Sequence, residues 1–431
     1  MKLLMMALKL LCTLWGSTVM AEDFSQLVPS VLDVHATGDG LNLFSGGFSA
    51  GDHGYLLPNA NGKVARFDLA SFSNVQVLDL TLADSSLKVF YGGFSSDGYG
   101  YVVPWSNGAS FFGKVARFDL ATFSLVEVLD LTLTDPDLKG FIGGFSSGGY
   151  GYVVPFRNGN VNSASPAGSF GKVARFDLAT FSTVEVLDLT LTDPDLKGFH
   201  GGFSSGDYGY LVPCNNGATP YGSKVARIDL ATFADVVVLD LALTDSDLKG
   251  FYGGFSANDH GYLVPYNGGV WNSKVVRFNL ATFSTVEVLD LALTDPDLKG
   301  FAYGFSSGNY GYLIRISNWQ GQVRSGKVVR FDLSTFSKVV VLDLAVTNSE
   351  LTNFEGGFSA GNYGYAVPNQ SGKVVRFGID PNDPEPDTGA CFHGSSTVSL
   401  SSGASKRFSD LDLGDVIKTS DGQGHFAFNP V

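Results

Sequence analysis

Short runs rich in Val, Phe and Tyr alternate along most of the chain with turns of Gly, Asn, Asp and Ser. Such runs are typical of β-strands, and no segment between them has the length and apolar spacing of an amphipathic helix. In one unit of the pattern, the runs at 199–204, 208–213, 224–230 and 236–241 predict four strands. The unit recurs seven times at spacings of 46 to 58 residues, a period typical of propeller blades. We therefore predict an all-β, seven-bladed β-propeller.

Three short motifs recur in these units, and the last of them is displaced. Gly-Phe-Ser and Lys-Val-Ala/Val-Arg occur seven times, but Val-Leu-Asp-Leu is missing after the seventh Lys-Val, at Lys373. A counterpart, Val31-Leu32-Asp33-Val34, precedes the first Gly-Phe-Ser. We expect this N-terminal strand to pair beside 373–377. That pairing closes the ring and removes two exposed sheet edges.

Two repeated charged features have structural interpretations. An Arg stands two residues before an Asp in five units, as in Arg117 and Asp119. Side chains two apart on a strand share a face, and charges between blades need partners, so we expect buried Arg–Asp contacts.

The connections between units carry Asp-x-Asp, as in Asp135-Pro136-Asp137. We interpret them as N-caps of one-turn helices, and Ca²⁺ ligation by these carboxylates stays an open alternative.

The N-terminal segment, residues 1–21, has the pattern of a secretory signal. Lys2 and Lys9 flank an apolar run, and Val19-Met20-Ala21 offers a cleavage site before Glu22. The run is too short to span a membrane, and no other stretch approaches the roughly 18 apolar residues that a span needs. We expect a secreted, extracellular protein without a transmembrane segment.

Charge and cysteine content narrow the possible partners. The chain has 28 basic and 42 acidic residues, a formal net charge of −14. This balance argues against binding to nucleic acid or to an anionic membrane surface. After the signal only Cys214 and Cys391 remain, which excludes a disulfide scaffold. We expect a monomer, with no cofactor and no metal site.

The loop between the second and third strands differs most between units. It is short at 59–62 and 369–372 and long at 158–171 and 317–326. In an antiparallel meander this loop lies on the same face as the connections between blades, and insertions on one face often mark the binding face. Aromatic and Arg side chains there suit contact with an extracellular protein or glycan, although the rings have the alternative of packing over neighbouring loops. The candidate binding residues are Trp105, Phe156, Arg157, Tyr221, Tyr266, Trp271, Trp319 and Arg324, with Phe111 and Phe112 beside them.

Catalytic chemistry on the ring has little support in the sequence. His53 and His260 occupy the position that Tyr99 or Tyr208 fills in other units. No nucleophile elbow, zinc-binding helix or phosphate loop occurs, and the repeats suggest no asymmetric cluster of carboxylates or histidines at the central channel. A binding module is the leading interpretation of residues 22–379. The alternatives are an extracellular propeller hydrolase or lyase acting on polysaccharide, and a purely structural secreted repeat protein.

A different module begins after an acidic, Pro-rich linker at 380–390. Cys391-Phe392-His393-Gly394 is followed by Val398, Gly403, Lys406, Asp410-Leu411 and Gly414-Asp415. Over residues 391–431 this order resembles the opening of the β-rich Hint domain of hedgehog-type and intein-type autoprocessing proteins. The resemblance implies that Cys391 is a nucleophile that attacks the carbonyl of Ala390 and forms a thioester, from which the propeller is released. The Thr-x-x-His element of that family does not occur in 391–431, so we expect no self-cleavage by these residues alone and no turnover enzyme.

Overall fold

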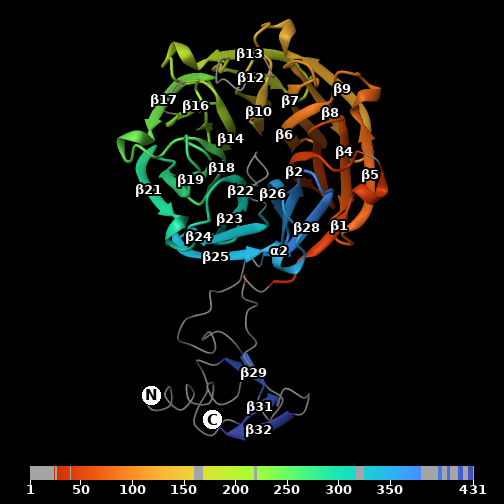
Figure 1. Cartoon of the computed structure of the whole chain (residues 1–431), viewed down its shortest axis with the longest axis vertical. Helices are drawn as coiled ribbons and strands as arrows, with labels where there is room; N and C mark the ends of the chain where they lie inside the picture. Colours follow the sequence, from red (N-terminus) through yellow and green to blue (C-terminus); the bar gives the residue numbers. More distant parts are fainter. Residues whose placement is uncertain are drawn as a thin grey trace. The chain divides into compact units, whose positions relative to one another are not determined.

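The computed structural model describes Phe24, residues 27–38, 40–159, 168–217, 221–316 and 325–379, and four short strands between 397 and 430. Phe24–Pro381 form one compact unit. Within it, 28 strands make seven four-stranded antiparallel sheets arranged around a central axis (Figure 1). This confirms the all-β, seven-bladed propeller that the repeats predict.

Each blade runs from an innermost strand at the axis to an outermost strand at the rim. From the axis outward, the strands are β2 (Phe44–Ala50), β3 (His53–Pro58), β4 (Lys63–Asp68) and β5 (Ser73–Asp79) in blade 1; β6 (Val89–Ser96), β7 (Tyr99–Ser106), β8 (Lys114–Asp119) and β9 (Ser124–Asp130) in blade 2; β10 (Phe141–Ser147), β11 (Tyr150–Pro155), β12 (Lys172–Asp177) and β13 (Ser182–Asp188) in blade 3; β14 (Phe199–Ser205), β15 (Tyr208–Pro213), β16 (Lys224–Asp229) and β17 (Ala234–Asp240) in blade 4; β18 (Phe251–Ala257), β19 (His260–Pro265), β20 (Lys274–Asn279) and β21 (Ser284–Asp290) in blade 5; β22 (Phe301–Ser307), β23 (Tyr310–Arg315), β24 (Lys327–Asp332) and β25 (Ser337–Asp343) in blade 6; and β26 (Phe354–Ala360), β27 (Tyr363–Pro368), β28 (Lys373–Gly378) and β1 (Ser30–Asp33) in blade 7.

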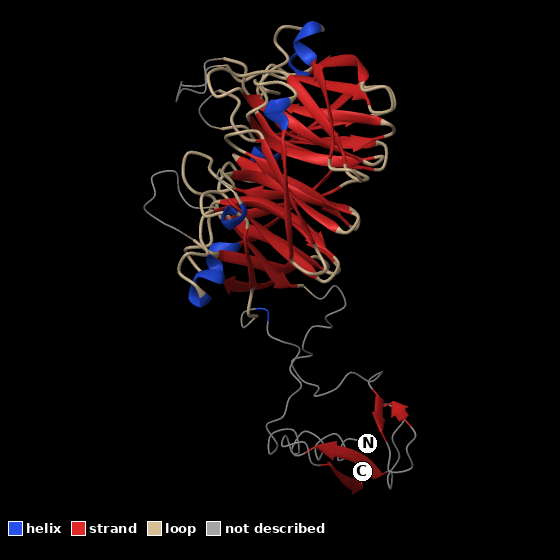
Figure 2. Ribbon diagram, turned by 90° about the vertical axis from the view of Figure 1, so that its right-hand side faces the viewer, coloured by secondary structure: helices blue, strands red, loops and turns tan. Residues whose placement is uncertain are grey.

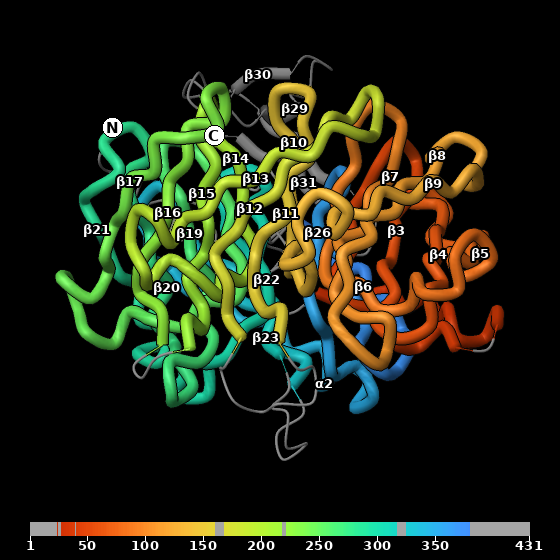
Figure 3. Tube along the Cα trace, turned by 90° about the horizontal axis from the view of Figure 1, so that it is seen from above, coloured from red at the N-terminus to blue at the C-terminus, as the bar shows by residue number. Residues whose placement is uncertain are grey.

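The N-terminal strand closes the ring as predicted. β1 pairs antiparallel with β28, with Ser30 opposite Arg376 and Asp33 opposite Lys373. The first and last parts of the ring therefore lie side by side, red beside blue in Figures 1 and 3. The seventh sheet gains its outermost strand, and no blade edge is left open at the join.

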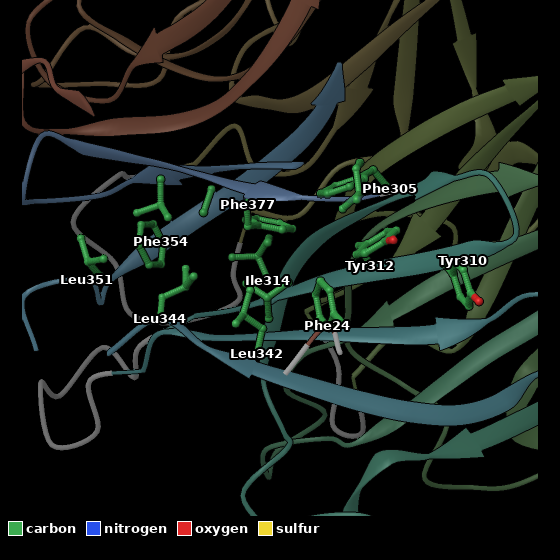
Figure 4. Packing of buried hydrophobic residues seen from close by; sticks show 14 residues of the cluster. Phe24, Phe305, Tyr310, Tyr312, Ile314, Leu342, Leu344, Leu351, Phe354 and Phe377 are labelled. Carbon is green, nitrogen blue, oxygen red and sulfur yellow. The ribbon is translucent and has the colours of Figure 1, made fainter. Parts of the chain in front are cut away.

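Phe24 is a second closing element, and it was not anticipated from the sequence. Its ring is 1% exposed and lies with its centroid 5.7 Å from that of Tyr312 and 6.2 Å from that of Phe377 (Figure 4). In the other blades a Phe before the outermost strand fills this position against the preceding blade, as Phe123 does against Tyr55. Phe24 thus supplies the inter-blade contact that blade 7 otherwise lacks.

The repeated Arg residues join neighbouring blades, which corrects the expected Arg–Asp contacts. The Arg117 guanidinium donates to the carbonyl of Leu178 in the next blade at 2.7 Å and pairs with Glu127 rather than with Asp119. Asp119 instead accepts a hydrogen bond from the backbone N–H of Thr122. The Arg side chain reaches past its own strand to the next blade, whereas the shorter Asp side chain stays within its own turn.

Short helices connect the blades, five residues earlier than predicted. They are η2 (His35–Thr37), η3 (Leu80–Leu82), η4 (Leu131–Leu133), η5 (Leu189–Leu191), η6 (Leu241–Leu243), η7 (Leu291–Leu293) and α2 (Leu344–Thr347). The cap of η4 is Asp130, which accepts from the N–H of Thr132. Asp135 lies after this helix, where Asp135 and Asp137 accept hydrogen bonds from Lys172 of the next blade at 2.8 and 3.0 Å. The N-cap assignment of Asp135 is therefore wrong.

These helices and the loops between second and third strands lie on one face of the ring, here called the helix face (Figure 2). Hydrogen bonds join the two sets of segments, as when the backbone N–H of Leu131 in η4 donates to the carbonyl of Gly113 at 3.0 Å. The opposite face carries the tight turns between first and second strands. The predicted placement of the variable loops beside the blade connections is confirmed.

The tail is described only through the backbone of two hairpins. β29 (Thr397–Ser399) pairs with β30 (Ser405–Arg407), and β31 (Val416–Ser420) pairs with β32 (Phe426–Pro430). Ala390 and Cys391 lie outside the described residues. Among the residues that the structure describes, no helix has the length and hydropathy needed to cross a membrane.

Candidate functional site

One position of the innermost strands breaks the sevenfold pattern. Each strand reads Phe-x-Gly-Gly-Phe-Ser, apart from one change in blade 6, and the residue at x differs between most blades. We call these seven side chains, at the helix-face end of the central channel, the channel ring. All except the half-buried Tyr91 are buried. The channel ring consists of Ser45, Tyr91, Ile142, His200, Tyr252, Ala302 and Glu355.

Glu355 is the charged member of the channel ring, and the residue is 2% exposed. The Tyr252 hydroxyl donates to Oε1 at 2.6 Å, Asn369 Nδ2 donates to Oε2, and the Tyr91 hydroxyl also hydrogen-bonds to the carboxylate. These donors are neutral, and no Lys, Arg or His of the described residues forms a salt bridge with Glu355. Burial raises the pKa of Glu355 to about 7, so its carboxyl changes charge near neutral pH.

Tyr303 breaks the pattern a second time, one residue after the channel ring. It occupies the first Gly position of the motif with a φ of 56°, in the left-handed region where the equivalent residues of the other six blades are all glycine. A non-glycine residue there costs on the order of 1–2 kcal/mol. Strain of this kind persists where the surrounding structure holds it and often marks functional positions.

The Tyr303 ring extends across the channel. It lies against Gly253 and Gly356, and its hydroxyl approaches Gly92 on another blade. Together with Gly304 and the glycine pairs of the other six blades it lines a cavity of about 160 Å³ along the axis. The hydroxyl is buried and has no hydrogen-bond partner within the described part of the chain, and burial raises its pKa. Tyr303 therefore separates this cavity from the channel ring.

His200 is the second titratable side chain of the channel ring. Its ring centroid lies 3.4 Å from that of Tyr252 and 5.7 Å from that of Tyr303. It is 2% exposed, and its Nδ1 has no hydrogen-bond partner as far as the chain is described. Burial lowers the pKa of His200 to about 3. The imidazole is neutral at ordinary pH and adds no positive charge next to Glu355.

Half-buried aromatic side chains from the end of β7 and from the helix-face loops continue outward from the channel ring. Trp105 lies 5.5 Å from Tyr91 and 5.7 Å from Phe156, centroid to centroid. Tyr266 lies 4.7 Å from Tyr252 and 5.3 Å from Trp271. The sequence prediction named these four loop residues, and the structure places them against the channel ring. We call Trp105, Phe156, Tyr266 and Trp271 the aromatic arc.

The other predicted binding residues lie outside this group. The Arg157 guanidinium carbon is 5.2 Å from the Phe156 ring, and its Nε has no hydrogen-bond partner within the described residues. Burial lowers the pKa of Arg157. Tyr221 is half-buried, with its ring beside Gly269. Phe111 and Phe112 are buried, and Trp319 and Arg324 lie outside the described residues.

The repeated Asp-x-Asp turns are occupied by lysine. Lys224 bridges Asp193 and Asp195 at 2.8 and 2.9 Å, as Lys172 does for the preceding turn. Where side chains are described, no group of three or more His, Cys, Asp and Glu residues could hold a metal ion. Through these Lys–Asp ion pairs, an Asp-x-Asp turn joins its connection to the third strand of the following blade.

Sequence reasoning missed the channel ring because it searched for what the repeats share. The expectation that the channel has no asymmetric cluster is wrong: Glu355, Tyr252, Tyr91 and His200 meet there. The signal was available. Aligning the seven Phe-x-Gly-Gly-Phe-Ser segments shows one carboxylate and one histidine at x, and one Tyr in place of a Gly.

Comparison with known proteins shows the fold. No protein-family model matches the chain, and no curated protein does. A solved structure of virginiamycin B lyase from Staphylococcus aureus has a TM-score of 0.58 and 11% identity, and the match covers 82% of this chain and 100% of that one. Hydrazine synthase from Kuenenia stuttgartiensis has a TM-score of 0.56 and 11% identity, and the match covers 85% of this chain and 99% of that one. YCF48 bound to a D1 peptide has a TM-score of 0.54 and 13% identity, and the match covers 82% of this chain and 95% of that one. At these identities the likeness establishes a propeller and leaves the function to be argued from the site.

Proposed function

We propose that this chain is a secreted binding module, which holds an extracellular protein or glycan on its helix face at the mouth of the central channel. The carrying observation is the break in the sevenfold pattern. The repeat would allow the same residue at x in every blade. Instead, the x positions differ and place Glu355, Tyr252 and Tyr91 together in one hydrogen-bonded group. Half-buried rings of the aromatic arc surround this group and offer surface to a ligand.

The geometry favours binding over the alternative of a polysaccharide hydrolase or lyase. Acid–base catalysis requires a side chain within hydrogen-bond reach of the substrate. Glu355 and His200 are each 2% exposed, so neither reaches a polymer lying on the helix face. The aromatic arc is the accessible part of the site, and aromatic rings give contact area at little cost in side-chain entropy.

The extracellular location is part of the proposal and is supported by the signal pattern of residues 1–21. Expression with the native N-terminus in a secreting eukaryotic cell tests it. We expect protein in the medium whose first residue is Glu22. Retention inside the cell with Met1 intact would contradict this part of the proposal.

Binding to a glycan array and to a panel of purified extracellular matrix proteins tests the site. The variants Trp105→Ala and Trp271→Ala each remove one ring of the aromatic arc. Leu125→Ala is a matched control, because Leu125 is 68% exposed and follows a turn on the opposite face. We expect the variants of the aromatic arc to weaken binding at least tenfold and the control to bind normally. A ligand that binds all of these proteins equally would place the binding site elsewhere.

For the tail we propose descent from a Hint module, with Cys391 as the nucleophile for the Ala390 carbonyl. The two hairpins within 397–430 support a β-rich segment. Hydroxylamine cleaves thioesters, so cleavage at Ala390-Cys391 that disappears in Cys391→Ala identifies the acyl shift. For the 431-residue chain we expect no cleavage in either protein. Cleavage in the unchanged chain would overturn that expectation.

A further inference from the structure

We infer that the mouth of the channel binds an organic cation, a protonated or quaternary amine, against the aromatic rings that cover the Glu355 carboxylate. This inference rests on the proposed binding function and names the chemistry of the ligand group that reaches the channel ring.

The Glu355 carboxylate has no cation beside it among the described residues. The groups that face Glu355 are Tyr91 from β6, Tyr252 from β18, Tyr303 from β22 and the amide of Asn369, all of them neutral. His200 on β14 lies behind Tyr252 and is neutral too. In the described residues, nothing positively charged offsets the carboxylate, and buried charges in proteins are usually paired. A cationic ligand would supply the missing partner.

Elsewhere in the same chain, aromatic rings and a carboxylate already hold a cation. Between blades, the repeated Arg side chains lie over aromatic rings with guanidinium–centroid distances of 4.3 to 5.0 Å. Arg117, for example, lies 4.3 Å from the Tyr99 ring and 4.5 Å from the Phe181 ring, and pairs with Glu127. Two aromatic rings and a glutamate thus hold one cation. The channel mouth repeats this set of partners without the guanidinium.

Some of the aromatic rings around the channel mouth are accessible from the helix face. Tyr91, Trp105 and Tyr266 are half-buried, so part of each ring faces a ligand that approaches the helix face. Cations are attracted to the faces of Trp and Tyr rings, and the attraction grows where water is excluded. An ammonium group that packs against these rings lies on their accessible side, where the negative charge of the Glu355 carboxylate beneath them attracts it, and the rest of its molecule lies on the aromatic arc.

Protonation of Glu355 links this binding to pH. A cation beside the carboxylate favours its charged form, and the pKa of Glu355 in the free protein is about 7. Binding therefore releases a proton near neutral pH. The affinity rises between pH 6 and pH 8 and levels off above that range, because the carboxylate is then already ionised.

Tetramethylammonium is the probe, measured by line broadening of its methyl protons in ¹H NMR and by isothermal titration calorimetry on the propeller-containing chain. Sodium chloride at equal ionic strength controls for screening. We expect saturable binding that strengthens at least threefold from pH 6 to pH 8. Glu355→Gln, which keeps the shape of the side chain, should weaken it at least tenfold. Glu350→Gln removes an exposed carboxylate that pairs with Lys373 and should leave it unchanged.

Lack of saturable binding to the unchanged protein would overturn the inference, as would equal binding by Glu355→Gln. The pH profile of the unchanged protein is a second readout that does not depend on the folding of any variant. Glucosamine and Nα-acetyl-lysine amide then distinguish an amino sugar from a protein lysine as the source of the amine, with N-acetylglucosamine as the neutral control. If Trp105→Ala and Trp271→Ala lose the array ligand while tetramethylammonium does not bind, the proposed function stands and this inference fails.

Discussion

The buried carboxyl of Glu355 gives the sharpest prediction for stability. Replacing it with Gln keeps the size and hydrogen-bonding capacity of the side chain and removes its titration. Burial raises the pKa of Glu355 from its ordinary 4.5 to about 7. Each pH unit of difference corresponds to about 1.4 kcal/mol, so the unfolding free energy carries a pH-dependent contribution of about 3 kcal/mol from this one group.

The sign follows from the direction of the change in pKa. A group whose pKa is higher in the folded state binds protons more tightly there, so its contribution is fully present below the unfolded pKa of about 4.5. The contribution is lost as the pH rises through about 7. The unfolding free energy of the unchanged protein should therefore fall relative to that of Glu355→Gln by about 3 kcal/mol between pH 4.5 and pH 8.

Urea denaturation of both proteins, followed by tryptophan fluorescence and circular dichroism across this range, measures the difference. The titration of His200, whose pKa burial lowers to about 3, opposes the trend in each protein separately, but it is common to both and cancels in the difference. Glu350→Gln is the control and should show a flat difference over the same range. A flat difference for Glu355→Gln as well would refute the argument that this carboxyl is buried without a cation.

Further predictions concern the ring and the channel. Phe24→Ala should lower the unfolding free energy by about 3–5 kcal/mol, because a ring that is 1% exposed is removed from a packed blade junction; a change below 1 kcal/mol in urea denaturation would show that Phe24 does not help to close the ring. Deleting residues 26–36 removes β1 and should produce an opened, aggregating protein, whereas a monomer by light scattering with unchanged melting would contradict the closure. Tyr303→Gly restores the repeat and joins the axial cavity to the channel ring, so the pKa of Glu355 should fall toward 4.5 as water reaches it, and the pH-dependent stability difference should shrink. The ring of His200, with its pKa lowered by burial to about 3, should keep its neutral ¹⁵N chemical shifts down to pH 5, and a midpoint near 6.5 would contradict its burial.

Repetition made the propeller predictable. Four strands per unit, seven units and the displaced strand at 31–34 follow from period, strand composition and turn residues, and the pairing of Ser30–Asp33 with Lys373–Arg376 confirms the closure. Phe24 was overlooked because five residues separate it from β1, whereas Phe123 adjoins β9 directly. The helical turn was placed too late because Asp130 and Asp135 both resemble caps, and only tertiary contact with Lys172 distinguishes them.

For a related reason, the aromatic arc could be predicted from the sequence and the channel ring could not. Trp105 ends the second strand of its blade, and Phe156, Tyr266 and Trp271 stand in the unequal loops that follow this strand in other blades, so comparison of the units reveals all four. Glu355 and Tyr252 lie in strands that look alike, 103 residues apart in sequence, and their 2.6 Å hydrogen bond exists only because the ring brings β18 and β26 to one axis. Contacts across the channel follow from closure of the ring, and strand patterns alone do not report them.

The most direct test of the channel mouth as a ligand site is ¹⁹F NMR of the protein labelled with 5-fluorotryptophan and titrated with tetramethylammonium at pH 8. Trp105→Phe assigns one resonance. Because Trp105 packs 5.5 Å from Tyr91, which hydrogen-bonds to Glu355, we predict that the Trp105 resonance shifts saturably in the unchanged protein and stays fixed in Glu355→Gln. A Trp105 resonance that does not move with the probe, or that moves equally in both proteins, would contradict the account.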